Sequence, residues 1–414
     1  MRTEIQHKDT AATAASVVPV FRQAQTVGGA LFVIGLIGAG IGFFLSPRAF
    51  WSSYMFAFVF WAGMTLGATT LTYLHHSIRA TWSVAILRLL EAANRTMPYI
   101  AVLWLGLVAG LVTHALYQWG NPELVAQSEL MQKKTYWLNT PGYIVRGIIY
   151  FAFWLGTMAW LNSSSRKQDL TGDDRLADKR ATFAAPLGVV HVVLLTLAFT
   201  DWVMSLDPAW FSTIYGALFM IAQILAMLSL GMIIFLGLRN RRPYNLVIHK
   251  QITRDIGTVL LGFTMFWTYF TLSQFLIIWS GNLPEEIPFF INRFAGGMSI
   301  IGGLIILLQF FVPFVALLSV RLKRDPKLLF PVAGLVLTIR IVDSWWQIIP
   351  FFRVGADAFN LGAIALDLGV WAAVGGLWIL LFSKNVIEYA QENLLVVRHD
   401  TRLVEGKLAE EHHA

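Results

Sequence analysis

Residues 211–237 read FSTIYGALFMIAQILAMLSLGMIIFLG, a stretch that contains no Asp, Glu, Lys, Arg or His. An α-helix rises about 1.5 Å per residue, so about 20 predominantly apolar residues cross the hydrocarbon core of a bilayer. The stretch is long enough and apolar enough for this. It therefore predicts a membrane-spanning helix.

Blocks of the same kind recur along the whole 414-residue chain. They predict an all-α membrane protein with about ten transmembrane helices, in which residues 25–384 form a single ten-helix transmembrane domain. Residues 1–24 and 385–414 are then two cytoplasmic tails. The expected spans are 25–45, 51–74, 97–117, 142–162, 184–206, 211–237, 255–280, 296–320, 329–350 and 361–384.

The composition agrees with this class, because 57% of the residues are hydrophobic and 13% are charged, whereas a soluble domain carries roughly 25% charged residues. The chain has no cysteine, which excludes thiolate-held iron–sulfur clusters, haem attached through Cys-x-x-Cys-His, and disulfides. A b-type haem would need two facing histidines at one depth, and the histidines offer no such pair. We therefore expect no redox cofactor, metal or catalytic residue on this chain.

The basic residues indicate the orientation. When alternate loops are assigned to opposite sides of the membrane, one side receives 24 of the 31 Lys and Arg residues and the other receives 5. Because cytoplasmic loops carry the excess of Lys and Arg, both termini are expected in the cytoplasm. The same distribution explains the net charge of +7, so no nucleic-acid partner is expected.

A few ionisable residues fall inside the expected spans, where each charge costs on the order of 2.5–3.5 kcal/mol. One interpretation is a proton relay or a polar pocket for a quinol headgroup, with Arg340 holding Asp343 ionised. The other is that Arg340 and Asp343 form a structural ion pair, with Asp367 bonded nearby. The relay candidates are His191, Asp201, Asp343 and Asp367, and the candidates for an inner mouth are His75, His76, Glu91, His249 and Asp255.

Two cytoplasmic stretches are expected to be solvated. Residues 78–96 mix leucines and isoleucines with charges, which is typical of an interfacial amphipathic helix or an extension of the third span. Arg88, Glu91 and Arg95 share one face of it, which is expected to be a solvated charged face rather than a functional one. Residues 163–183 are the most hydrophilic internal stretch and predict a mobile loop.

Four stretches carry a more specific signal. In sequence order they are Tyr136–Pro141 with Arg146 and Tyr150-Phe151, then Asp201–Thr213, then Gln274–Trp279 with Gly281–Glu286 and Arg293, and last Arg340-x-x-Asp343-x-x-Trp346 with Pro350. They resemble the two polysulfide-reductase-type (NrfD-like) membrane subunits of bacterial alternative complex III, a quinol:electron-acceptor oxidoreductase. The resemblance runs from about His75 to Ser383 and is greatest to the smaller of these two proteins. Trp137 departs from the pattern, since we expect the tyrosine to be followed directly by Leu-Asn.

The resemblance implies two four-helix bundles, the second to fifth and the sixth to ninth spans, flanked by the first and tenth. It implies a bacterial inner membrane, a sister membrane subunit, and periplasmic subunits that carry haem c and iron–sulfur clusters. Menaquinol would bind the sister subunit rather than this one, and the pair would couple its oxidation to proton movement. Asp207, Glu285 and Glu286 on the outer face would contact partners or form a proton exit.

Two other functions remain open from the residues alone. A stand-alone secondary transporter often has helices broken by Gly or Pro near mid-membrane in both halves, whereas here Pro313 alone lies deep in an expected span. That favours the respiratory subunit. A structural scaffold for partner subunits is the third alternative, and the sequence does not separate it from a proton conductor.

Overall fold

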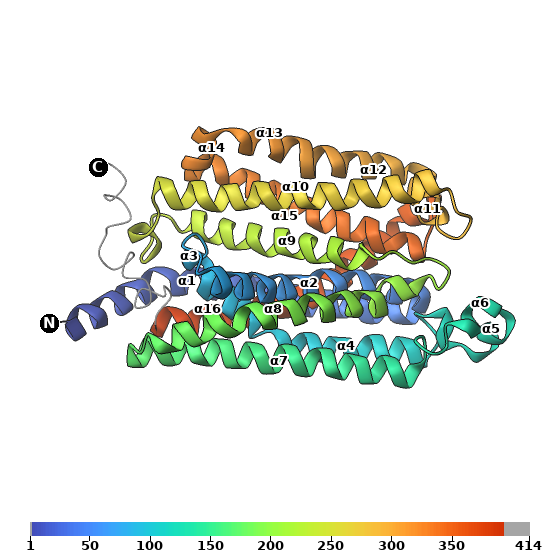
Figure 1. Ribbon diagram of the computed structural model, residues 1–414, viewed down its shortest axis with the longest axis horizontal. Coiled ribbons are helices and arrows are strands. Elements are labelled where there is room, and N and C mark those ends of the chain that lie inside the picture. The colour runs from blue at the N-terminus through green and yellow to red at the C-terminus, as the bar shows by residue number, and fades with distance from the viewer. Residues whose placement is uncertain (1, 393–414) are drawn as a thin grey trace.

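The computed structural model describes residues 2–392. Within that range, nine helices are long and apolar enough to cross a membrane, or up to ten if the bent pair α3–α4 counts as one span. The long helices lie side by side along one axis (Figure 1). They are α1 (Arg2–Leu45), α2 (Pro47–Ile78), α3 (Val84–Asn94), α4 (Met97–Val112), α7 (Thr140–Thr171), α8 (Arg175–Trp202), α9 (Tyr215–Gly237), α10 (Lys250–Gly281), α15 (Pro326–Ile348) and α16 (Leu361–Glu392).

The remaining span is interrupted. It runs over Pro288–Leu318 and consists of α11 (Pro288–Phe294), α12 (Met298–Ile305), a π-helical turn (Ile306–Phe311) and α13 (Val312–Leu318), followed by the short α14 (Val320–Arg324). Gly296 and Gly297 adopt positive φ between α11 and α12, and this breaks the helix because an interior helical residue has negative φ.

α2 and α9 form the centre of the molecule. α2 is buried almost all round, and Gly67 permits its contact with α9, because a Cβ there would lie 2.3 Å from the Gln223 carbonyl oxygen. α1 and α16 pack antiparallel and equally closely, since a Cβ at Gly35 would lie 2.6 Å from the Gly369 carbonyl oxygen. Small residues let helices approach to such distances inside a membrane.

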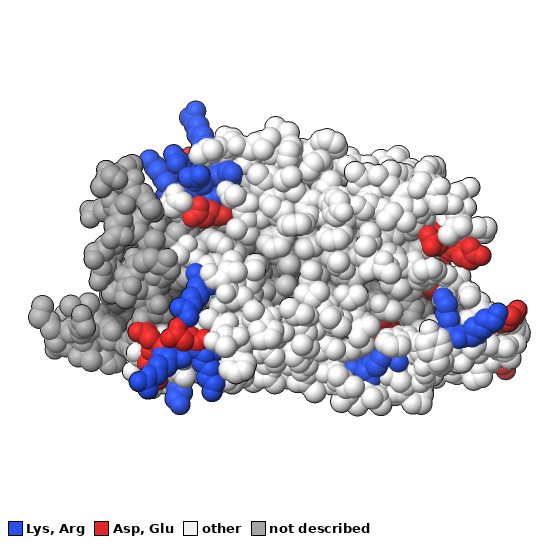
Figure 2. All heavy atoms as spheres, in the orientation of Figure 1, with Lys and Arg blue, Asp and Glu red and all other residues white. Residues whose placement is uncertain are grey.

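The outer helices expose apolar faces. Phe44 on α1 and Leu361 on α16 are 84% and 83% exposed, and Figure 2 shows that, on the face in view, the charged side chains gather mainly toward the two ends of the molecule, with a broad uncharged belt between. Such a belt faces hydrocarbon rather than water. The chain is therefore a multi-pass membrane protein. We call the end where α1 begins and α16 ends the N/C end, and the opposite end, which carries α5 (Pro122–Gln127) and α6 (Glu129–Lys133), the α5/α6 end.

The helices are longer than expected from hydropathy. Residues 163–183 are not a mobile loop, because α7 continues to Thr171 and α8 begins at Arg175. Residues 2–24 belong to α1, and residues 385–392 continue α16; the expected tail at 393–414 lies outside the described residues. In the third span, α4 ends at Val112 and is bent by 45° from α3. Hydropathy locates the apolar middle of each helix but not its polar ends, which here are stabilised by helix–helix contacts.

Candidate functional site

Four carboxyl groups lie within the helical bundle, and each forms an ion pair with an arginine. Glu91, Asp201, Asp343 and Asp367 are at most 2% exposed. Removing one partner from such a pair leaves an uncompensated buried charge, at a cost of about 3–5 kcal/mol. The four clusters are therefore places where this protein retains charge against a strong physical penalty.

The first cluster surrounds Asp201, one residue before the end of α8. Arg146 of α7 donates from Nε and Nη2 to the two carboxylate oxygens, each at 2.8 Å. Tyr150 donates its hydroxyl at 2.8 Å, and Trp137 donates its indole N–H at 2.9 Å. The Arg146 guanidinium also lies over the Trp137 ring, 4.2 Å from its centroid. Side chains from one helix and the turn before it thus satisfy both carboxylate oxygens.

The geometry of that cluster depends on where α7 begins. The Asn139 side chain accepts a hydrogen bond of 2.7 Å from the Gly142 backbone N–H, and Pro141 occupies the first turn of the helix. Both are standard signals for a helix start. This cap fixes the phase of α7, so that Arg146 and Tyr150, four residues apart, point at the same carboxylate.

The second cluster surrounds Asp367 of α16. Arg353, in the connection before that helix, places Nη2 2.7 Å from both carboxylate oxygens. Trp345 of α15 donates its indole N–H at 2.8 Å, and Ser53 of α2 donates its hydroxyl at 2.5 Å. Three separate elements therefore converge on this carboxylate.

The third cluster is Asp343 with Arg340, one turn earlier on α15. The side chains of both residues are 3% exposed. The Arg340 guanidinium lies over the Trp267 ring, 5.4 Å from its centroid. The structure confirms the expected ion pair. It also places Asp367 with a different arginine, Arg353, rather than with this pair.

Asp343 borders a cavity of about 280 Å³ between α9, α10, α11, α12 and α15. Several lining polar atoms have no hydrogen-bond partner among residues 2–392, namely Trp267 Nε1, Thr271 Oγ1 and Gln347 Oε1. A cavity of this size with several polar partners can hold water molecules. Asp343 therefore borders a space that can hold water molecules.

His191 lies apart from the three aspartates. Its Nδ1 accepts the Trp154 indole N–H at 3.0 Å, so its neutral ring carries the proton on Nε2. Nε2 lies 2.8 Å from the Thr70 hydroxyl, and that hydroxyl donates to the Leu66 carbonyl oxygen at 2.9 Å. Both ring nitrogens are thus bonded to neutral groups. The expected relay residues consequently do not form one chain of direct contacts: His191, Asp201, Asp343 and Asp367 belong to separate clusters.

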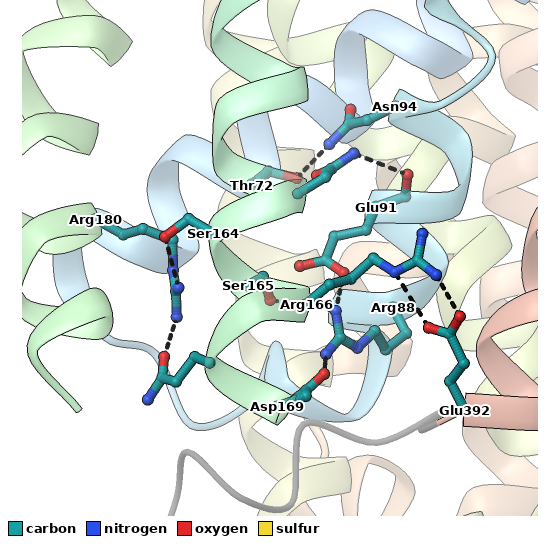
Figure 3. A network of polar contacts seen from close by, with 12 residues as sticks. Thr72, Arg88, Glu91, Asn94, Ser164, Ser165, Arg166, Asp169, Arg180 and Glu392 are labelled. Carbon is teal, nitrogen blue, oxygen red and sulfur yellow. Dashed lines mark hydrogen bonds and ion pairs between the residues drawn. The ribbon is translucent and has the colours of Figure 1, made fainter. Parts of the chain in front are cut away.

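The fourth cluster lies toward the N/C end and is drawn in Figure 3. Arg88 forms ion pairs with Glu91 on its own helix and with Asp169 of α7, and it donates to the Ser165 hydroxyl at 3.2 Å. Nearby, Arg180 of α8 donates to the Gln168 side chain of α7 at 2.5 Å. The network joins α3 to α7 and α7 to α8.

The expectation of a solvated charged face on residues 78–96 is therefore wrong. Arg88 and Glu91 are 1% and 0% exposed, and Arg95, which is partly exposed, pairs with Glu388 of α16. Arg166 of α7 pairs with Glu392 in the same region (Figure 3). The end of α16 covers the face that a hydropathy profile assigns to water.

A series of neutral polar side chains continues along α2 from this end. Asn94 accepts from the Thr69 hydroxyl at 3.0 Å and donates to Thr72 at 2.9 Å. Further along, the hydroxyls of Thr65 and Thr96 lie 2.7 Å apart. Hydrogen-bonded hydroxyls and amides between helices are a low-cost way to place polar groups inside a membrane.

The other inner-mouth candidates divide between two places. His75 and His76 are buried on α2, with ring centroids 4.9 Å apart, and His75 Nδ1 lies 2.7 Å from the Ser83 hydroxyl. His249 precedes α10, where partial burial lowers its pKa, and Asp255 accepts from Gln251 one turn earlier. The structure thus places His75, His76 and Glu91 around α2 and α3, and the other two at the start of α10.

The carboxyls expected on the outer face belong to connections at the α5/α6 end. Asp207 accepts the Ala209 backbone N–H at 3.0 Å and so stabilises the turn between α8 and α9. Glu285 is exposed and Glu286 half-buried in the turn after α10. All three thus lie on connecting segments rather than inside spans.

The principal residues missed by sequence reasoning are the partners of the buried acids. Hydropathy places Arg353 in a loop and Asp169 in the mobile stretch, and it marks Arg146 as an intramembrane charge without pairing it to Asp201. A usable signal exists for Arg146, because an unpaired arginine in a span needs a carboxylate at similar depth. The pairing of Arg353 with Asp367 depends on the fold of the connection between α15 and α16.

Among the described residues there is no group of three or more His, Asp and Glu side chains arranged to hold a metal ion. Comparison with known proteins assigns no family, since no protein-family model matches the chain and no curated protein sequence matches it.

Proposed function

We propose that this protein is an integral membrane subunit of a multisubunit quinol:electron-acceptor oxidoreductase, and that it contributes to assembly and proton translocation. It is most like the smaller of the two polysulfide-reductase-type membrane proteins of bacterial alternative complex III. One observation carries this proposal. Trp137, Arg146 and Tyr150 belong to one of the stretches that resemble the family, Asp201 belongs to another, and the four residues form a single hydrogen-bonded cluster.

The energetics support a role beyond packing. Well-packed apolar side chains of similar volume often replace a buried ion pair at no loss of stability, so stability does not require four such clusters. Ionisable residues inside spanning segments commonly mark proton or ion pathways. The aspartates and Glu91 are the groups that can gain and lose protons, and the arginines are their ion-pair partners.

Under this proposal α2, α4, α7 and α8 form the first four-helix bundle, and α9, α10, the α11–α13 span and α15 form the second, with α1 and α16 beside them. The N/C end faces the cytoplasm of a bacterial inner membrane. The sister subunit binds menaquinol, and subunits with haem c and iron–sulfur clusters dock on the α5/α6 end, where Glu285 is exposed and Glu286 half-buried.

One structural observation also fits a second candidate, a secondary transporter. The helices of both halves are interrupted, by the 45° bend between α3 and α4 and by the positive-φ glycines before α12. Paired broken helices are common in transporters, where they form the substrate site near mid-membrane. The two candidates differ in their partners: the respiratory subunit assembles with other subunits, whereas the transporter stands alone.

The distinguishing experiment is mild detergent extraction of a chromosomally tagged protein, followed by haem spectroscopy and identification of co-purifying chains. The respiratory subunit is expected to bring haem c, an iron–sulfur protein and a second polytopic subunit, and the preparation is expected to oxidise menaquinol. A preparation that stays a single chain without haem absorbance, under conditions that keep a known respiratory complex intact, contradicts the proposal and favours the transporter.

A further inference from the structure

A second cavity, of about 560 Å³, lies between α1, α2, α9, α15 and α16. Close-packed interiors leave few voids larger than a water molecule, whereas pockets that hold a ligand measure roughly 300–1,000 Å³. The cavity is therefore a ligand-sized space that the described side chains leave unfilled.

The lining of this cavity is apolar. It includes Trp61, Trp371 and Phe382, and Ser383 is its one non-aromatic polar residue among those described. Two polar side-chain atoms of the lining, Trp371 Nε1 and Ser383 Oγ, have no hydrogen-bond partner among residues 2–392, and the rest of the surface is apolar. An aliphatic chain fits this lining.

The cavity is open on one side. Gly237 on α9 and Phe330 on α15 belong to its lining, and both remain exposed. A Cβ at Gly237 would lie 3.5 Å from the Phe330 ring, which shows how near the two helices approach at this edge. In a membrane protein the medium outside an apolar opening is lipid, so the bilayer itself supplies an occupant.

Basic residues lie close in sequence to lining residues at the N/C end. Arg22 of α1 follows Phe21, Lys384 of α16 follows Ser383, and Arg239 follows Leu238 just after the end of α9. Lys327 precedes Phe330 by about one turn on α15. Within residues 2–392, none of these four cations forms an ion pair, and Arg22, Lys327 and Lys384 are exposed.

We propose that this cavity binds an anionic phospholipid, with an acyl chain in the apolar space and the phosphate headgroup beside Arg22, Arg239, Lys327 and Lys384. An apolar cavity alone would bind an acyl chain of any phospholipid. The four cations select the anionic class, because Lys and Arg near a membrane surface attract anionic headgroups. This inference is independent of the function proposed above, since it rests on the other cavity and other residues.

The test uses the protein extracted from its membrane with whatever subunits accompany it, washed extensively in detergent. Mass spectrometry of the bound lipid is expected to show near-stoichiometric retention of phosphatidylglycerol or cardiolipin. After delipidation, phosphatidylglycerol is expected to raise the thermal unfolding midpoint more than phosphatidylcholine of the same chain length, because a ligand that binds the folded state stabilises it.

Two variants separate the headgroup from the chain. Replacing the four bordering cations together (R22Q, R239Q, K327Q, K384Q) is expected to abolish the preference for phosphatidylglycerol. A matched control with the same loss of charge at the same end (K250Q, R254Q, R321Q, R324Q) keeps it. Ile234→Trp, which fills the cavity from α9, is expected to abolish retention of either lipid, while Ile234→Val is not.

The proposal is overturned if washed protein retains no phospholipid, as it would if a partner helix or a second copy occupied the cavity. It is also overturned if the four-cation variant and its control behave alike, or if Ile234→Trp retains lipid as the parent does. If Ile234→Trp fails to fold, the headgroup variants and the comparison of the two lipids still decide the outcome.

Discussion

Arg353 binds Asp367 symmetrically, with one guanidinium nitrogen 2.7 Å from each carboxylate oxygen. The arginine lies outside the long helices and the aspartate inside one, 1% exposed. The pair therefore anchors the connection between α15 and α16 to the interior of the membrane domain.

Arg353→Gln is expected to destabilise the protein by about 3–5 kcal/mol, because it leaves the Asp367 carboxylate buried without its counter-charge. Asp367→Asn should cost less, since an amide keeps hydrogen bonds to Ser53 and Trp345. Thermal unfolding of the parent, the two single variants and the double variant Arg353→Gln/Asp367→Asn in detergent measures the coupling free energy between the two residues. If the double variant is no more stable than Arg353→Gln alone, the unpaired charge is not the cause.

Arg88→Leu should destabilise the protein by about 3–5 kcal/mol, because it leaves the buried carboxylate of Glu91 without its arginine. Arg95→Leu is the matched control, two helical turns away on the chain and paired with partly exposed Glu388. That pair is worth about 0–1 kcal/mol. Equal effects of the two changes on the unfolding midpoint would contradict the buried network.

Asp343→Asn is expected to leave assembly intact while lowering the number of protons released per quinol oxidised in vesicles. The reason is that the amide keeps the volume and most hydrogen bonds but does not titrate. Arg340→Leu should do more harm, because it leaves the carboxylate unpaired. If Asp201→Asn, Asp343→Asn and Asp367→Asn each pump like the parent, these carboxyls are structural and the protein is a scaffold.

A reporter enzyme that is active only in the cytoplasm should be active when fused at residue 172, in the turn between α7 and α8, and inactive at residue 285, in the turn after α10. The physical reason is the excess of Lys and Arg in the connections at the N/C end. The reverse pattern of activities would invert the orientation. Partner subunits would then dock on the other end.

The sequence predicts the helical membrane fold and the Arg340–Asp343 pair because both depend on local information. Apolar length identifies a span, and a spacing of three places two side chains on one helix face. It does not predict that Glu91 is buried, because the covering residues Glu388 and Tyr389 come almost 300 positions later. Helix ends are missed for the same reason, since their polar residues are stabilised by distant partners.

Trp137 illustrates the limit of pattern comparison. In the sequence it is an inserted residue that disturbs the expected loop register. In the structure its indole N–H bonds to Asp201 and its ring supports Arg146. A departure from a sequence pattern here supplies a contact of the site.

The glycine contact between α1 and α16 has a consequence for biogenesis. Among the described helices α1 is synthesised before the others, and α16 is synthesised after them. α1 packs against α16 with Gly28 beside Gly376 and Gly35 beside Gly369. The surface of α1 that contacts α16 must therefore remain in the translocon or in lipid until α16 has been synthesised. Nascent chains truncated before α16 would expose it, which gives cellular quality control a signal for unfinished copies.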